Sequence, residues 1–151
     1  MDKIIVSDTS CLIALDNIGM LYILKNLFKE VLITPEVKEE FGNQLPNWII
    51  VLQVQNKSKQ TEIESKLDKG EASSIALALE IPNSTLIIDE VKGRNIAKNL
   101  NIEIIGTVGI IILAGKKGVV NDVISVILKL VNNGFRLSNK IVDRIIEIYG
   151  K

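Results

Sequence analysis

Histidine is absent from this sequence, and its absence excludes a large part of enzyme chemistry. Without it there is no Ser-His-Asp or Cys-His triad, no imidazole acid–base catalyst and no histidine-ligated metal. The single cysteine, Cys11, excludes an intramolecular disulfide and a cysteine-based zinc site. If the protein is an enzyme, it has to use carboxylates, hydroxyls, lysine, arginine or a hard metal ion.

The sequence also has few aromatic residues, no net charge and no long apolar segment. Aromatic residues make up 4%, so platforms for stacking nucleobases are scarce. Lys plus Arg and Asp plus Glu each number 18, which gives no general attraction to nucleic acid or membranes. The longest apolar segment, residues 104–114, is far shorter than the roughly 20 residues of a membrane helix. There is no basic, then apolar, amino-terminal leader pattern. We therefore expect a cytoplasmic protein with no membrane contact.

Apolar runs with β character alternate with helical patterns along all 151 residues. We expect strands at residues 3–7, 31–34, 48–54, 85–88 and 103–105. We expect helices at residues 10–16, 18–27, 35–41, 58–67, 71–80, 91–100, 108–116, 119–131 and 138–149, with Gly70 interrupting the helical segment before residue 71. This alternation predicts an α/β fold with a central parallel sheet covered on both faces. Residues 1–151 form one domain in this interpretation, and residues 119–151 are a helical pair packed on it.

Acidic residues follow two of the predicted strands. Asp8 comes after residues 3–7, and Asp89 and Glu90 come after residues 85–88. Parallel sheets bind their ligands beyond the carboxyl ends of the strands, which favours a functional role. The alternative is structural: Asp8 can cap the following helix, worth about 1 kcal/mol, and Asp89 and Glu90 can favour a helix dipole.

Two further acids, Glu40 and Glu71, lie on predicted helices. Glu71 precedes Ile75 and Leu79 by four and eight residues, so it heads a predicted apolar stripe, an unusual place for a solvated acid. Glu40 borders the buried face of its helix, and on its own it is best explained as a surface residue.

Convergence of these acids would have a clear chemical consequence. Two carboxylates about 4 Å apart repel by roughly 4 kcal/mol at an effective dielectric constant near 20. A shared proton or a cation has to offset that repulsion. With only oxygen ligands available, the expected cation is Mg²⁺ or Mn²⁺, which activates water and stabilises the charge of a phosphodiester under attack.

Five segments occur in an order that resembles a known family. They are SDTSCLIAL, ITPEVKEEF, GEASSIALALE, LIIDEVKGR and IIGTVG. Together they resemble a PIN domain, the nuclease fold of the toxins in VapBC-type toxin–antitoxin pairs. The likeness is greatest to a prokaryotic PIN subgroup that carries GEA, the DE/GR segment and the GTxG turn.

The resemblance implies a three-layer α/β/α sandwich with a metal-dependent endoribonuclease centre that uses Mg²⁺ or Mn²⁺. The residues it implies for catalysis and metal binding are Asp8, Glu40, Glu71 and Asp89, with Glu90 as the alternative fourth acid. Ser10 and Thr107 would support this centre with nearby hydroxyl groups. Thr107 would support either a carboxylate or a phosphate oxygen.

Substrate and partners also follow from the resemblance. RNA is the expected substrate, and Arg94 and Lys92 are candidate contacts to its phosphates; a solvated surface position is the alternative for each. The apolar residues of the last two helices suit packing on the sheet, a homodimer surface or a groove for an antitoxin protein. The expected role is therefore a ribonuclease, with the toxin of a type II pair as one form of it.

Three other functions compete with this prediction. A non-catalytic RNA- or partner-binding domain can use the same fold, and Glu71 stands where many toxins have aspartate. A haloacid-dehalogenase-type phosphatase needs a second aspartate two residues after the first, where this sequence has Ser10. A receiver domain places its acidic pair after the first strand, whereas here the pair comes late. We rank the last two low.

Overall fold

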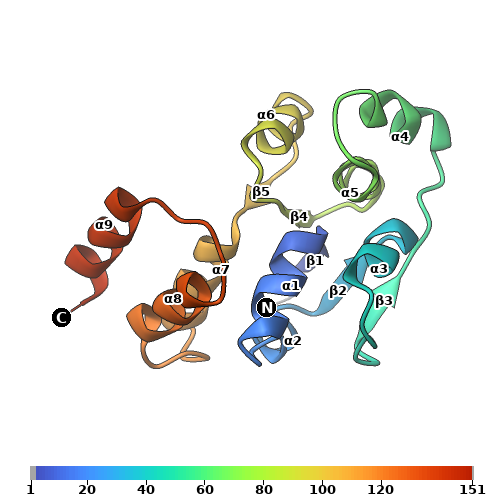
Figure 1. The fold of residues 1–151 in the computed structure, drawn as a ribbon. Coiled ribbons are helices and arrows are strands. Elements are labelled where there is room, and N and C mark those ends of the chain that lie inside the picture. The colour runs from blue at the N-terminus through green and yellow to red at the C-terminus, as the bar shows by residue number, and fades with distance from the viewer. Residues whose placement is uncertain (1–2, 151) are drawn as a thin grey trace.

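The computed structural model describes residues 3–150, which form a parallel sheet with helices on both faces (Figure 1). The strands are β1 (Ile4–Ser7), β2 (Glu30–Ile33), β3 (Ile49–Val51), β4 (Ser84–Ile87) and β5 (Ile104–Ile105). The helices are α1 (Thr9–Asn17), α2 (Tyr22–Leu27), α3 (Pro35–Phe41), α4 (Lys57–Glu64), α5 (Lys69–Glu80), α6 (Val91–Asn99), α7 (Thr107–Lys116), α8 (Val123–Asn132) and α9 (Asn139–Tyr149). This confirms the predicted α/β architecture with its central parallel sheet.

The strand order is β3-β2-β1-β4-β5, and every neighbouring pair is parallel. From β1 the chain adds strands first on one side and later, through β4, on the other. The reversal falls between β1 and β4, where Ile4 pairs with Ser84 and Ser7 with Ile87. A reversal of this kind opens a crevice at the carboxyl ends of the two strands, which is where such sheets bind ligands.

The strands bury side chains on both faces, which divides the core into two layers. Ile5 and Ile87 belong to one apolar cluster, whereas Val6, Leu86 and Ile88 belong to the other. This alternation follows from the two-residue period of a strand. Helices α4, α5 and α6 cover the second face, and α1, α2, α7 and α8 cover the first, so the sheet is the middle of three layers (Figure 1).

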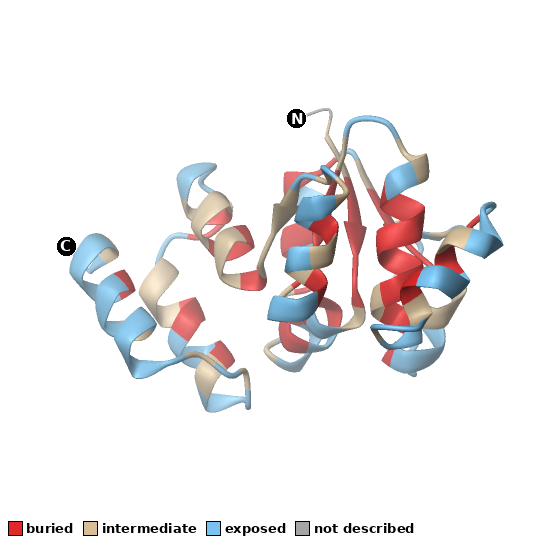
Figure 2. Ribbon diagram, turned by 90° about the horizontal axis from the view of Figure 1, so that it is seen from above, coloured by how far each residue is buried: buried red, intermediate tan, exposed pale blue. Residues whose placement is uncertain are grey.

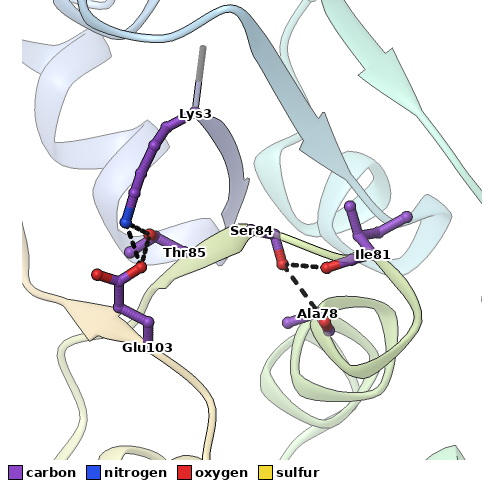
Figure 3. Close-up of polar contacts among 6 residues, drawn as sticks. All are labelled: Lys3, Ala78, Ile81, Ser84, Thr85 and Glu103. Carbon is purple, nitrogen blue, oxygen red and sulfur yellow. Dashed lines mark hydrogen bonds and ion pairs between the residues drawn. The ribbon is translucent and has the colours of Figure 1, made fainter. Parts of the chain in front are cut away.

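Polar contacts hold the amino ends of three strands together (Figure 3). Lys3 forms an ion pair with Glu103, and its ammonium group also donates to the Thr85 hydroxyl at 3.3 Å. Thr85 in turn donates to the Glu103 carboxylate at 2.6 Å. Ser84 donates to the carbonyl of Ile81 at 2.8 Å, which ties β4 to the end of α5. The opposite, carboxyl edge of the sheet carries the acidic residues.

Several helix boundaries differ from the sequence prediction: α2 begins at Tyr22 instead of residue 18, and α4 ends at Glu64 instead of residue 67. In two further cases an aspartate cap explains the difference. Asp68 accepts from the backbone N–H of Glu71, so α5 begins at Lys69 and Gly70 lies within its first turn rather than interrupting it. Asp122 accepts from the N–H of Ser125, so α8 begins at Val123 instead of residue 119. An oxygen acceptor at this position satisfies a backbone donor that the helix itself leaves free.

The last helix, α9, lies at the outer edge of the molecule and contacts α8. Ser138 caps it, and most of the helix is coloured as exposed in Figure 2. Ile145 is its one buried residue, while Ile141 and Ile148 are exposed. Over residues 3–150, every helix is too short or too polar to cross a membrane.

We predict that Thr34→Val lowers the free energy of unfolding by about 1–2 kcal/mol. The buried Thr34 hydroxyl accepts from the N–H of Val37 at 3.2 Å and bonds the Ser73 hydroxyl at 2.7 Å, so it both caps α3 and joins it to α5. Urea denaturation measures the loss. Thr61→Val, an exposed position on α4, is the matched control and should lose far less. Equal losses would show that the buried cap is unimportant.

Candidate functional site

Asp8 occupies the crevice between β1 and β4. Its backbone N–H donates to the carbonyl of Ile87 at 3.2 Å, which fixes it beside the end of β4. Its carboxylate caps α1 by accepting from the N–H of Cys11 at 3.4 Å. The side chain is nevertheless only 2% exposed. The structural role considered for Asp8 is therefore real, and the same geometry leaves a buried carboxyl group at the ligand-binding edge of the sheet.

Asp89 lies two residues after β4 and is held from the neighbouring segment. Its carboxylate accepts from the backbone N–H of Thr107 at 2.8 Å and from the Thr107 hydroxyl at 2.6 Å. A Cβ atom at Gly106 would lie 2.9 Å from this carboxylate, so only glycine leaves room for it there. Thr107 thus positions Asp89 firmly at the carboxyl edge.

Glu40 reaches the same edge from the end of α3. Its carboxylate accepts from the Thr9 hydroxyl at 2.5 Å, which links α3 to the first residue of α1. The carboxylate also sits against Gly70 of α5, where an added Cβ would overlap it. The residue is exposed, so its charge lies at the rim of the site.

Glu71 comes from the first turn of α5 and is partly buried. Its backbone N–H donates to Asp68 at 2.9 Å. One carboxylate oxygen, Oε2, is buried without a hydrogen-bond partner and lies 3.2 Å from where a Cβ at Gly93 would stand. A buried carboxylate oxygen without a partner is costly, which makes it a natural position for a ligand.

The carboxyl groups of these residues lie near enough to influence one another's pKa values, and we call them the acidic cluster. Its members are Asp8, Glu40, Asp68, Glu71, Asp89 and Glu90. Burial, followed by the charge of Asp89, raises the pKa of Asp8 from 3.8 to about 8. Burial, followed by the neighbouring Asp68 carboxylate, raises the pKa of Glu71 from 4.5 to about 7, with further contributions from Glu90 and Glu40. Asp89 thus acts on Asp8, while Glu90 acts on Glu71.

Asp68 is the member that the sequence analysis missed. It carries the N-cap of α5 and lies three residues before Glu71. The segment Asp68-Lys69-Gly70-Glu71 has an acid at both ends of a capping-box spacing, and this signal was available in the sequence. Because we expected Gly70 to interrupt the helix, Asp68 was not considered as the cap of α5.

The acidic cluster is loosely spaced. Within residues 3–150, no three Asp, Glu or Cys side chains come close enough together to hold one ion. The ion pairs of this part of the chain, Lys3–Glu103 and Lys59–Glu62, involve none of its members. A closed cage of protein ligands is therefore not formed, but Mg²⁺ typically takes only one or two direct carboxylates and keeps several waters. The spacing and the unpartnered Glu71 oxygen fit an ion of that kind.

The other candidate residues have varied positions. Ser10 is exposed and lines a cavity with Asp89 and Glu90, whereas the hydroxyl that bonds a cluster carboxylate is that of Thr9. Arg94 is half-buried, and its guanidinium donates to the Ile88 carbonyl at 2.9 Å. Lys92 is exposed.

Two details correct or extend the sequence analysis. Ile75 is buried as expected, but Leu79 is 41% exposed, so the apolar stripe behind Glu71 ends earlier than predicted. Cys11 is fully buried, and burial raises the pKa of its thiol, which disfavours a nucleophilic thiolate.

Carboxylates gather at the edge of a five-stranded parallel sheet, where the strand order reverses between β1 and β4. Comparison with known families identifies the class of protein that has this arrangement. The sequence model described as a PIN domain matches residues 4–151, and the chain belongs to the PIN domain family. PIN domains are typically nucleases. No curated protein and no solved structure matched the chain.

The raised pKa values predict how the stability of the metal-free protein depends on pH. Folded Asp8 keeps its proton up to about pH 8, whereas the unfolded chain loses it near 3.8, so the folded state binds more protons between these values. Stability therefore falls as pH rises through that window. Glu71 acts in the same direction between 4.5 and about 7. Urea unfolding in EDTA across this range measures the decline.

Asp8→Asn separates ionisation from capping, because asparagine still offers an oxygen to the Cys11 N–H but cannot ionise. The variant should show a clearly shallower decline of stability with pH. Asp16→Asn, at the exposed end of the same helix, should keep the wild-type decline. Identical slopes for wild type and Asp8→Asn would refute the assignment.

Proposed function

We propose that this PIN domain is a metal-dependent endoribonuclease that hydrolyses RNA phosphodiester bonds. The observation that carries the proposal is the acidic cluster, in which buried Asp8 and partly buried Glu71 have pKa values raised by burial and by neighbouring carboxylates. Ionising such groups together is costly, and a divalent cation relieves that cost. The cluster lies where the strand order reverses, and parallel sheets bind their ligands at such points.

Asp8, Glu71 and Asp89 are the residues we propose to hold Mg²⁺ or Mn²⁺, with Glu40 and Glu90 at the rim. The unpartnered oxygen of Glu71 supports this set. When bound, such an ion lowers the pKa of water and stabilises the charge that develops on a phosphodiester. The Asp68 carboxylate accepts from the backbone N–H of Glu71 and so helps to position Glu71.

The residues around the acids have positioning roles in this proposal. Thr107 fixes the Asp89 carboxylate with two hydrogen bonds, and Thr9 fixes that of Glu40. Arg94 holds the Ile88 carbonyl next to Asp89, so we assign it a supporting role beside any phosphate contact. Lys92 is exposed and available to an RNA phosphate, and Ser10 lines a cavity with Asp89 and Glu90.

The biological setting stays a prediction. We propose a cytoplasmic ribonuclease that acts as the toxin of a type II pair, with an antitoxin protein as its partner, and that forms a homodimer. The exposed Ile141 and Ile148 of α9 support a protein contact at this end of the molecule.

A non-catalytic RNA- or partner-binding domain is the second candidate. It is favoured by the spacing of the acidic cluster, which within residues 3–150 brings no three ligands together. This alternative predicts that RNA binding survives EDTA and that RNA stays intact in Mn²⁺.

Asp8→Asn should reduce RNA cleavage in Mg²⁺ or Mn²⁺ by roughly 100-fold or more, as expected for loss of one group that stabilises the transition state. Cleavage of a labelled RNA by purified protein measures this, and the melting temperature reports whether the fold is intact. Asp16→Asn removes an exposed carboxylate from the same helix and should cleave like wild type. Unchanged cleavage by Asp8→Asn would defeat the proposed centre.

Gly70→Ala should weaken Mn²⁺ binding while leaving the protein at least as stable as wild type. The added Cβ would overlap the Glu40 carboxylate and displace it, whereas alanine is the better helix former by about 1 kcal/mol. Titration calorimetry with Mn²⁺ and thermal unfolding measure the two effects. The exposed Ser58→Ala on α4 is the control for an added or removed small group. Wild-type Mn²⁺ affinity in Gly70→Ala would exclude Glu40 from the metal site.

A further inference from the structure

A cavity of about 440 Å³ adjoins the acidic cluster. Ser10, Asp89 and Glu90 line one side of it, and the connection between α8 and α9 lines the other through Phe135 and Arg136. These two residues stand more than 40 positions after Glu90 in the sequence, and no sequence pattern indicates that they meet the acids. The volume lies in the range of small-molecule and cofactor sites.

The cavity presents different chemistry along its length. Ile13 and Ala14 of α1 contribute apolar surface, and Asn17 adds an amide at the end of that helix. Phe135 is half-buried: it packs against the core while it also lines the cavity. Arg136 is exposed, and the ion pairs of residues 3–150 do not include it. The lining therefore offers an aromatic surface, an amide and a cation, with carboxylates at the far side.

The backbone holds Phe135 in place before any ligand arrives. Its N–H donates to the Leu130 carbonyl at 2.9 Å, and that of Gly134 donates to Val131 at 3.1 Å. Gly134 has φ of +97°, a conformation that other residues rarely adopt, and this lets the chain leave α8 sharply. A preorganised aromatic residue loses little entropy when a ligand binds.

We propose that this cavity is a nucleotide subsite, which takes an unpaired base of RNA next to the phosphate held at the acidic cluster. Phe135 provides the surface for the base, and Arg136 binds the phosphate that follows it. An aromatic ring beside a cation matches a ligand that is both planar and anionic, which is the description of a nucleotide. The inference rests on the proposed nuclease function and adds the residues that would bind an unpaired nucleotide, Phe135 and Arg136.

The test measures binding of a fluorescent oligoribonucleotide of about eight nucleotides, within the usual span of single-strand sites. The protein carries Asp8→Asn, so that RNA stays intact, and the buffer contains Mg²⁺. Phe135→Leu should weaken binding about tenfold, the loss expected for one stacked base. Arg136→Gln should weaken it about fivefold and reduce the salt dependence. Phe135→Tyr, which keeps the ring, should bind like the parent protein.

Matched controls come from residues of the same type outside the cavity. Tyr22→Leu removes an exposed aromatic residue from α2, and Arg144→Gln removes an arginine from α9. Both should bind RNA like the parent protein. The same oligonucleotide with a single abasic position, moved along the chain, should lose affinity at one position only, and that loss should disappear in Phe135→Leu.

The outcomes distinguish this inference from the proposed function. Cleavage by the wild-type protein tests the function, and affinity in the Asp8→Asn background tests the subsite. Active wild type with unchanged affinity in Phe135→Leu and Arg136→Gln would overturn the subsite alone. Equal losses in the cavity variants and their controls would also overturn it. So would the absence of RNA binding both by the Asp8→Asn protein in Mg²⁺ and by the wild-type protein in Ca²⁺, where Asp8 is intact. A cavity variant that alters self-association instead of RNA affinity would assign the surface to a protein contact.

Discussion

Crowding of negative charge at one edge of the sheet is the constraint on which this structure depends. Parallel strands bring their carboxyl ends to a common edge, and here the two central strands each lead into an acid, Asp8 and Asp89. Burial, and after it repulsion from Asp89, raises the pKa of Asp8 to about 8. The fold tolerates this because it supplies donors: the N–H of Cys11 to Asp8, and Thr107 to Asp89. Stability at neutral pH therefore depends on the protonation of these carboxyl groups.

Space for these carboxylates comes from glycines rather than from the acids themselves. Gly70 faces Glu40 and Gly106 faces Asp89, whereas Gly93 lies closest to Ile88 and only then to Glu71. Each glycine belongs to a different segment from the acid beside it, so each pair joins two parts of the chain. In the GEA and GTxG segments, the glycine leaves room for a carboxylate from elsewhere in the chain.

The sequence was sufficient for the architecture because apolar runs and caps act locally. The strand at residues 3–7 and the helix at residues 35–41 need no knowledge of distant contacts, and the structure has both. The reach of Glu40 to Thr9 could not be predicted in the same way, because it depends on how α3 packs against α1. The cavity containing Phe135 depends on the path after α8, where a glycine turn sets the direction. Local sequence patterns determine the helices and strands. A functional site depends in addition on how those helices and strands pack against one another.

The loose spacing of the acidic cluster is itself informative about how the proposed nuclease would work. A closed set of protein ligands would satisfy an ion completely and leave no coordination position for a substrate. Here the carboxylates stay separated, and Glu71 keeps an oxygen without a partner. In the proposed scheme, such a site would bind a hard ion weakly until an anionic substrate added its own oxygens. The adjoining cavity then has a clear purpose in the proposed scheme: affinity for a nucleotide beside the cluster would bring the phosphate to the ion, and the ion would offset the repulsion between phosphate and carboxylates. Binding of metal and of RNA would therefore be mutually dependent.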